Sequence, residues 1–332
     1  MNELREQTGF IKIYVRCGWI DRINGGIDMK KKFRVYQVDA FTKEMFTGNP
    51  AGVVPNAEGM SEAQMQRLAR ELNNSETAFL FPGKDGEYDV HIRFFTPTNE
   101  VPICGHATIA SHYVRSMELG LDNARVVQKC GAGLIPVEVE KSGEGYRVTM
   151  FQGQTTIGEP LAQEYQDRLL TALGLTAEDL REDCPVTSAS TGAAKVMVGI
   201  KDVDKLHGLK PDMEALKTLS EDIGFRGYHV FTVHPGQSPL VHGRMFGPAN
   251  GINEDPVTGV ANGPLGGYLV HFSLIPAEGE EVRFVAAQGE AMGRAGSMEV
   301  GVALENGQHR DVQIVGDAVV AFQTEIELEC EE

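Results

Sequence analysis

Several features that would place a protein in one of the large classes are missing from this sequence. No apolar run in its 332 residues approaches the ~20 that a membrane-spanning helix needs. Basic residues are few, with 30 Lys and Arg against 47 Asp and Glu and a formal net charge of −17. Nucleic acid and anionic membrane surfaces are therefore not expected as partners, because both are bound through clustered Lys and Arg. A small anionic substrate stays open, because backbone amides bind a carboxylate even on an acidic protein.

Cysteine is sparse and shows no metal-binding or redox pattern. No CxxC pair occurs, so neither a zinc site nor a thioredoxin-like motif is expected. The odd number and wide spacing favour free thiols in a reducing compartment, which predicts a cytoplasmic protein. The five cysteines are Cys17, Cys104, Cys130, Cys184 and Cys330.

The first 28 residues lack the basic start and apolar stretch of a signal peptide. Met29 then opens Met-Lys-Lys-Lys-Phe-Arg-Val-Tyr, which resembles an ordinary translation start leading into a strand. We expect residues 1–28 to be a mis-set start or a disordered extension; the alternative is a genuine extra strand or arm. N-terminal sequencing of the native protein decides between them, and a mature end near residue 1 would contradict the mis-set start.

The rest of the composition is that of an ordinary globular chain, with 42% hydrophobic and 23% charged residues, and its length favours two domains. Strand and helix patterns alternate along both halves. A capping box at Ser61 and Gln64 predicts one helix start, and polar residues 152–160 predict a linker between domains. Further helices are expected after residue 104 and at 161–173 and 212–223, and strands at 88–94, 228–233 and 241–246.

Two short segments repeat a faint pattern. Cys104-Gly105-His106-Ala107 and Thr258-Gly259-Val260-Ala261 each place a glycine at the head of an apolar helix. A duplicated, two-lobed fold would leave this kind of trace.

Longer motifs stand in a characteristic order from about residue 33 to the C-terminus. Together they resemble the PhzF-like family, which is named for an isomerase of phenazine biosynthesis. Each segment alone is modest evidence, whereas their common order is specific. The segments are 39–41 with 48–53, then 74–79 with 93–100 and 104–108, then 244–248 with 254–265, and a weaker echo at 288–289 with 293–296.

The resemblance implies an α+β fold of the diaminopimelate epimerase type. Its two pseudo-symmetric lobes are each a curved, mostly antiparallel sheet or barrel around a central helix, and the active site lies between them. The N-terminal lobe would span 29–151 and be completed by about 314–332, and the C-terminal lobe would span 152–313. Members use no metal and no organic cofactor, and many are homodimers, so a homodimer is expected here.

The resemblance also assigns catalytic roles to three residues. Glu76 matches the family's catalytic glutamate, and proton shuttling near neutral pH needs a carboxyl whose pKa is raised by partial burial. His106 matches an active-site histidine, and its place at a helix start favours the neutral ring. Asp255 would face the cleft opposite Glu76. From the residues alone, each has a plain structural reading: a solvated loop glutamate, a histidine at a helix end, and a helix cap.

The remaining predicted site residues bind substrate. Gly105 and Gly259 let backbone N–H groups at two helix starts approach a carboxylate. Ser75 and Thr258 flank the catalytic residues. The other two, Cys104 and Val260, depart from the pattern of related enzymes.

Cys104 and Val260 narrow the choice of reaction. Related amino-acid racemases use two facing thiols, but the counterpart of Cys104 in the second lobe is Thr258, which argues against a two-thiol racemase. The phenazine isomerase has a substrate-contacting serine where this chain has Val260, so a different ligand is expected. The leading hypothesis is a cofactor-independent isomerase that moves a proton on a small carboxylated substrate. The alternatives are an amino-acid-type epimerase or racemase and a non-catalytic binding protein with the same fold.

Overall fold

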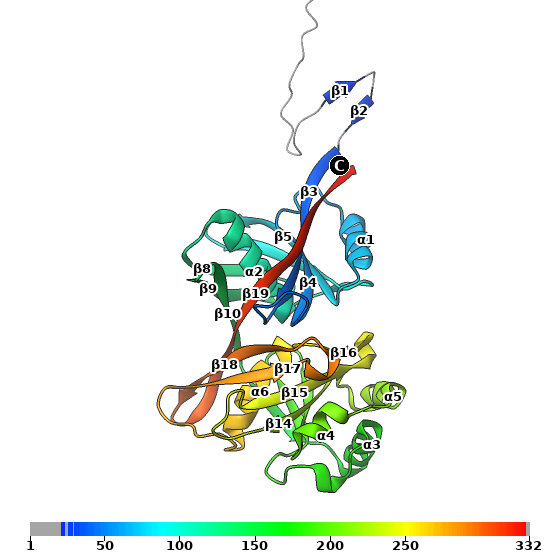
Figure 1. Cartoon of the computed structure of the whole chain (residues 1–332), viewed down its shortest axis with the longest axis vertical. Helices are drawn as coiled ribbons and strands as arrows, with labels where there is room; N and C mark the ends of the chain where they lie inside the picture. Colours follow the sequence, from blue (N-terminus) through cyan, green and yellow to red (C-terminus); the bar gives the residue numbers. More distant parts are fainter. Residues whose placement is uncertain (1–20, 24–25, 29, 330–332) are drawn as a thin grey trace, which may run out of the picture.

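The structure is a computed structural model that describes residues 21–23, 26–28 and 30–329. Its strands wrap around helices (Figure 1), which suits their half-buried sequence pattern. In β6 (Tyr88–Phe95), Val90, Ile92 and Phe94 are buried, as the alternation of apolar residues predicts. The helices are α1 (Glu62–Leu72), α2 (Gly105–Leu119), α3 (Gln163–Leu173), α4 (Val203–Gly208), α5 (Met213–Ile223) and α6 (Gly259–His271).

The strands of the first half close into a ring around α2. The ring runs β3–β4–β5–β6–β8–β9–β10–β19 and returns to β3. Ile109 and Val114 of α2 are fully buried inside it. Besides β6, the strands are β3 (Lys30–Ala40), β4 (Asn49–Val54), β5 (Glu76–Lys84), β7 (Glu100–Val101), β8 (Asn123–Cys130), β9 (Gly133–Ser142), β10 (Gly145–Gln154) and β19 (Gln308–Glu329).

The second half follows the same plan around α6. Its sheet runs β11–β12–β13–β14–β15–β17–β18–β19, and the end of β10 pairs with the start of β19. Its strands are β11 (Thr156–Pro160), β12 (Thr187–Ser190), β13 (Lys195–Gly199), β14 (Tyr228–Val233), β15 (Val241–Gly247), β16 (Ile252–Asp255), β17 (Glu281–Gln288) and β18 (Gly296–Glu305).

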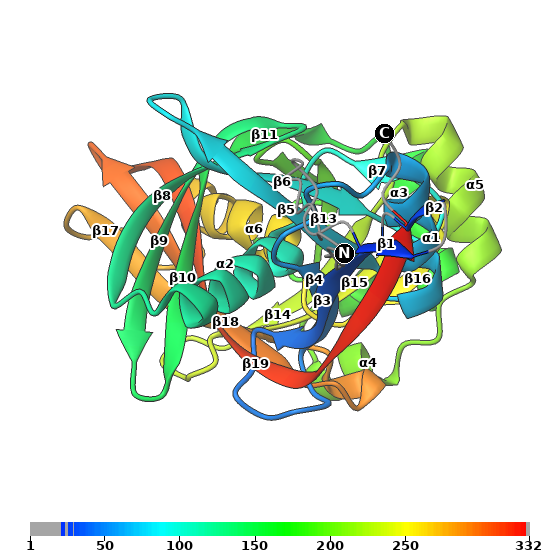
Figure 2. The same cartoon turned by 90° about the horizontal axis from the view of Figure 1, so that it is seen from above.

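Helices occupy equivalent places in the two halves. Parallel neighbours need a crossover connection, and α1 bridges β4 to β5 while α2 bridges β6 to β8. In the second half α4 and α5 bridge β13 to β14, and α6 bridges β15 to β17. Seen from above, α2 and α6 lie in the interior, while α1, α3 and α5 lie on the side of the molecule away from β8 and β9 (Figure 2).

The long strand β19 belongs to both halves. Its first part pairs with β18, its middle with β10, and residues Ala318 to Glu329 pair with β3. In Figure 1 it is the red ribbon that runs from the lower half to the upper half.

Small residues let α6 fit inside its sheet. A Cβ added to Gly263 would overlap the side-chain oxygen of Gln152, and one added to Gly267 would overlap the hydroxyl of Thr155. A side chain at Gly267 would therefore overlap Thr155, whereas one at Gly263 would require the flexible side chain of Gln152 to move. Because α6 is apolar on all sides rather than on one stripe, it suits the centre of a half and not a surface.

The predicted linker at residues 152–160 is wrong as a description of local structure. β10 continues to Gln154, and β11 follows from Thr156 to Pro160 and pairs with β12. The register of β10 shifts between Phe151 and Gly153, where Gly153 has a φ of 77°. This irregularity explains the polar, glycine-containing sequence, because a bulge in a continuous strand uses the same residues as a turn.

The N-terminal prediction falls mainly outside the described residues. Residues 1–20, 24–25 and 29 are not described. The short strands β1 (Asp21–Ile23) and β2 (Gly26–Asp28) pair with each other in a separate two-stranded sheet.

Candidate functional site

Glu76 is the first residue of β5, and local contacts fix its direction. Helix α1 ends at Asn73, which adopts the left-handed conformation with a φ of 53°. The next residue, Asn74, exchanges two amide hydrogen bonds of 2.9 Å with Gln37 of β3. These contacts anchor the turn that delivers Glu76 to the sheet beside Ala51 of β4.

Glu76 meets His106 in a nearly dry environment. Oε2 of Glu76 lies 3.4 Å from Nε2 of His106, and the two side chains are 14% and 5% exposed. Burial raises the pKa of Glu76, His106 partly offsets this effect, and the nearby charge of Asp255 adds to it. Burial lowers the pKa of His106 despite the attraction of Glu76, so the ring is neutral near pH 7. The raised pKa makes this carboxylate a stronger base than that of an exposed glutamate, which favours a role in proton transfer.

Cys104 lies against this pair of side chains, and its thiol is not activated. Its Sγ lies 3.4 Å from Nδ1 of His106, and burial, followed by the charge of Glu76, raises the thiol pKa well above its ordinary value. The ligand atoms of Glu76, Cys104 and His106 lie within 4.8 Å of one another, a spacing that a metal ion can bridge. A metal would need the thiolate, which this environment disfavours.

Asp255 ends β16 in the second half and is held by both halves. Nδ2 of Asn49, at the start of β4, donates to its Oδ1 at 2.8 Å, and the hydroxyl of Thr258 donates to its Oδ2. Burial raises the pKa of Asp255 to about 6, although both donors favour the ionised form. Gln288 supports the arrangement, because its Nε2 donates to the backbone oxygen of Asp255 at 2.7 Å.

The N-termini of α2 and α6 meet between these carboxyl groups. A Cβ on Gly105 would lie 3.4 Å from Cα of Gly259, so the two helix starts almost touch. The first N–H groups of a helix lack partners within the helix and carry its positive dipole end. Two such ends at one place make an anion site on a protein whose net charge is −17.

One cavity joins these features. It has a volume of about 430 Å3 and includes residues from both halves. Of the residues predicted from the sequence, it brings together Glu76, Cys104, Gly105, His106, Asp255, Thr258, Gly259 and Val260. Ser75 does not line the cavity, but its Oγ lies 3.5 Å from Nε2 of His106, which does.

Two basic residues that line the cavity, Lys195 and Arg226, are not predicted from the sequence. Lys195 begins β13, is buried, and donates to the carbonyl of Ala193 at 3.0 Å. Burial lowers its pKa to about 8, with Asp255 acting in the opposite direction. Arg226 lines the cavity as well. The one signal for Lys195 is that it directly precedes the wholly apolar stretch Val196-Met197-Val198, where a lysine has little access to water.

A buried ion pair supports the strand that carries Asp255. Arg244 of β15 makes two hydrogen bonds, of 2.8 and 2.7 Å, to the carboxylate of Glu254. Its Nη1 also donates to the carbonyls of Leu206 and Leu209 beside α4. A planar guanidinium suits this arrangement, because it can serve a carboxylate and two carbonyls at fixed angles.

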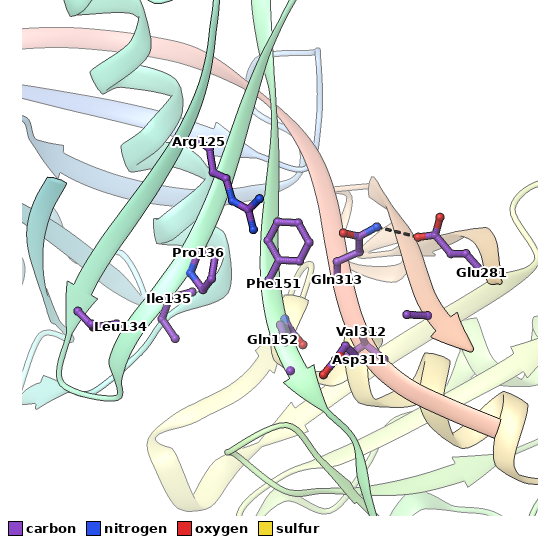
Figure 3. A pocket seen from close by; sticks show the side chains of 12 residues that line it. Arg125, Leu134, Ile135, Pro136, Phe151, Gln152, Glu281, Asp311, Val312 and Gln313 are labelled. Carbon is purple, nitrogen blue, oxygen red and sulfur yellow. Dashed lines mark hydrogen bonds between the residues drawn. The ribbon is translucent and has the colours of Figure 1, made fainter. Parts of the chain in front are cut away.

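A second hollow, of about 520 Å3, lies where β10 and β19 pass from one half to the other (Figure 3). Leu134, Phe151 and Gln313 are among the residues that line it. Its acidic groups are open to water, since Glu281 is 34% and Asp311 53% exposed. Acid–base chemistry is therefore better placed in the cavity between the helix starts.

Comparison with known proteins agrees with this fold. Residues 38–324 match the family model described as phenazine biosynthesis-like protein (PhzC-PhzF). The chain is 51% identical over 301 residues to an uncharacterised isomerase of Clostridium acetobutylicum, covering 90% of this chain and 100% of the relative. It is 32% identical over 266 residues to the trans-2,3-dihydro-3-hydroxyanthranilate isomerase of Pseudomonas aeruginosa, covering 80% and 88%.

Solved structures extend the likeness to the fold. A PhzF-family protein of Bacillus anthracis superposes with a TM-score of 0.80 at 28% identity, over 89% of this chain and 99% of that one. A hydroxyproline epimerase of Agrobacterium vitis superposes with a TM-score of 0.61 over 90% and 93%, and at 14% identity it is similar in fold alone. The chain belongs to the PhzC-PhzF family, and it is an enzyme of the isomerase class. The predicted family and fold class are confirmed.

No helix among the residues that the structure describes is long and apolar enough to cross a membrane.

Proposed function

We propose that this protein moves a proton within a small carboxylated substrate by general acid–base catalysis, without a cofactor. The observation that carries the proposal is the pair of buried carboxyl groups, Glu76 and Asp255, at one cavity that also receives two helix N-termini. Both pKa values are raised, that of Asp255 to about 6. Proton transfer needs groups that change protonation near neutral pH.

The substrate's carboxylate fits the positive end of the cavity. The N–H groups at Gly105 and Gly259, together with Lys195 and Arg226, supply donors and positive charge there. Val260 adds an apolar wall where a hydroxyl would add a donor. One relative is named for a carboxylated molecule, trans-2,3-dihydro-3-hydroxyanthranilate, and one structurally similar protein is named for another, hydroxyproline.

Glu76 then performs the transfer. Its carboxylate takes a proton from an activated carbon: the C–H bond breaks and an O–H bond forms. The electron pair shifts within the substrate, and the same O–H returns its proton to another carbon, so nothing is gained or lost overall. Neutral His106, 3.4 Å from Oε2, holds the carboxyl in place. Ionised Asp255 holds a substrate hydroxyl or amine on the other side.

Proton NMR in deuterium oxide tests this proposal. The wild-type protein is incubated with a panel of small acids that includes trans-2,3-dihydro-3-hydroxyanthranilate, and Glu76→Gln is run beside it. We expect isomerisation or exchange that falls by at least about 100-fold in Glu76→Gln, the scale of a lost general base. Exposed Glu87→Gln, in the β5–β6 turn, is the matched control and keeps full activity. Unchanged activity in Glu76→Gln would contradict the assigned role.

An epimerase is the second candidate, because Glu76 and Asp255 come from opposite halves of the fold and an epimerase shares that fold. Inversion at carbon takes a proton from one face and adds one from the other, so every turnover would bring in solvent deuterium. Isomerisation by Glu76 alone would retain part of the original proton in the product. A two-thiol racemase is disfavoured by the raised pKa of Cys104 and by Thr258, whose hydroxyl serves Asp255.

The lobe boundaries, the homodimer and the cytoplasmic location stay predictions. A homodimer is tested by sedimentation equilibrium, in which a single species of about 36.2 kDa would contradict it.

A further inference from the structure

Away from the cavity, three side chains of the second half converge on one point. His207 lies in α4, His242 in β15, and Glu290 in the short helical turn η3 (Glu290–Met292) after β17. Nε2 of His207 lies 3.0 Å from Oε2 of Glu290, and Nδ1 of His242 lies 3.0 Å from both carboxylate oxygens. Segments distant in the sequence thus aim two imidazoles at one carboxylate.

The spacing is close to that of a metal site. One ligand atom from each residue lies within 4.8 Å of the other two. Ligands bound tetrahedrally at about 2.1 Å from zinc lie about 3.4 Å apart. The two contacts to Glu290 are therefore within a few tenths of an ångström of coordination distance, and rotation of the partly exposed side chains would bring the two imidazole nitrogens, which lie within 4.8 Å of each other, onto a shared ion.

The site is preformed and reachable from solvent. The side chains of His207, His242 and Glu290 are 34%, 18% and 30% exposed. The backbone near His207 is anchored, because Arg244 donates to the carbonyls of Leu206 and His207. An ion can therefore enter without unfolding, and little conformational entropy is lost when it binds.

We propose that His207, His242 and Glu290 bind one divalent transition-metal ion of the zinc class. Two imidazole nitrogens and one carboxylate select Zn2+, Co2+ or Ni2+ over Mg2+ and Ca2+, which prefer oxygen ligands. Three protein ligands leave the remaining positions to water.

The position of Glu290 gives the ion a structural effect. Two residues before it, Gln288 holds the backbone of Asp255, and four residues after it, Arg294 donates to Asp39 of β3 at 2.7 Å. An ion on Glu290 joins this segment to α4 and β15. Bound metal therefore stabilises the connection between the second half and the first.

Isothermal titration of the full-length, chelator-treated protein with Zn2+ tests the site. We expect one equivalent to bind, with excess Mg2+ having no effect, and the unfolding temperature to rise with Zn2+ concentration. His242→Ala and Glu290→Gln should each weaken binding by at least about tenfold. The matched control is His271→Ala/His309→Ala, because those rings lie 5.7 Å apart, close to the 6.1 Å between His207 and His242.

Two further arms make the result decisive. Cys104→Ser should leave the affinity unchanged, because the proposed site does not include the cluster around Glu76, whose buried thiol resists the ionisation that a metal ligand needs. Anomalous scattering from a Zn2+-soaked crystal should place the ion between the three side chains, even where a variant folds poorly. Equal Zn2+ affinity in wild type, His242→Ala and Glu290→Gln, or no binding by wild type at 100 µM metal, on the order of weak extracellular sites, would overturn the proposal.

Discussion

Two ionisable residues, Lys195 and Asp255, determine how the charge of the cavity changes with pH. Lys195 is a lysine whose pKa is lowered to about 8, so it is charged below that pH and neutral above it. Asp255 has its pKa raised to about 6, so it is ionised above that pH and protonated below it. Lys195 is protonated and Asp255 is ionised at the same time only between about pH 6 and about pH 8. The rate constant kcat/KM should therefore fall on both sides of this window.

Replacing Lys195 tests the alkaline side. Lys195→Met should raise KM for an acid substrate by about tenfold or more at pH 7, because a charge-assisted contact is lost. It should also remove the rise in KM that wild type shows above pH 8, while kcat changes less. Lys201→Met is the control, since Lys201 is an exposed lysine bound to the carbonyl of Glu178. An unchanged alkaline limb in Lys195→Met would remove Lys195 from substrate binding.

Asn49 is a positioning residue on the acid side. Its amide donates to Asp255, and this favours the ionised carboxylate. Asn49→Ala should therefore raise the acid limb of kcat/KM by about one pH unit, the effect of losing one hydrogen bond to a charge. A loss of activity at every pH, with the limb unmoved, would indicate general damage to the fold instead.

Individual elements show which parts of the structure the sequence predicts well. Helix α1 begins with the expected capping box at Ser61, α5 follows its predicted N-terminus at Asp212, and β14 spans the predicted residues 228–233. These features depend on neighbours within a few positions. The local pattern predicts a linker rather than strands at 152–160, because the strand partners of this segment, in β12 and β19, lie far along the chain.

The site residues likewise fall into those that the sequence predicts and those that only the fold reveals. Glu76, His106 and Asp255 stand in recognisable motifs, and the cavity brings them together. Lys195 stands in no motif, and its role depends on a cavity wall that forms only when the halves meet. Asn49 lies within a motif, but its contact with Asp255 spans 206 positions.

Arg294 makes three of the side-chain hydrogen bonds between the two halves. Its guanidinium donates to Asp39 of β3 and to the carbonyls of Thr47 and Gly48. Asp39 is 3% exposed, so without Arg294 it would be a buried charge with only the N–H of Phe46 beside it. Arg294→Met should therefore lower the free energy of unfolding by about 3 kcal/mol, measured in urea.

The control for this element is an arginine in surface ion pairs. Arg283 is 46% exposed and pairs with Glu281 and Glu299. Arg283→Met should cost no more than about 1 kcal/mol. Equal losses of unfolding free energy in Arg294→Met and Arg283→Met would show that the contacts of Arg294 stabilise the fold no more than a surface ion pair does.

At the scale of the whole molecule, the two chain ends are expected to differ in importance. β1 and β2 form their own small sheet, and an isolated pair of strands is at most marginally stable. A variant that starts at Met29 should keep its activity, with its unfolding temperature changed by less than about 2 °C in scanning calorimetry. A drop of more than about 5 °C would instead support the extra-arm alternative.

The other end should tolerate no such removal. A variant that ends at Asp317 loses the part of β19 that pairs with β3, and the ring of the first half opens. We expect this variant to be insoluble or to lack cooperative unfolding. A soluble, cooperatively folded product would show that the ring does not need β19.

The path of β19 also determines when the ring around α2 can close during translation. Every other strand of the ring around α2 has been made by the time β10 ends at Gln154, yet the closing strand begins at Gln308. At roughly 5–20 residues per second, the ribosome leaves the edges of β3 and β10 uncovered for on the order of ten seconds. Open edges invite pairing with other nascent chains. A slow codon stretch in the second half would prolong this interval, so the yield of folded enzyme should depend on how fast the residues between β10 and β19 are translated.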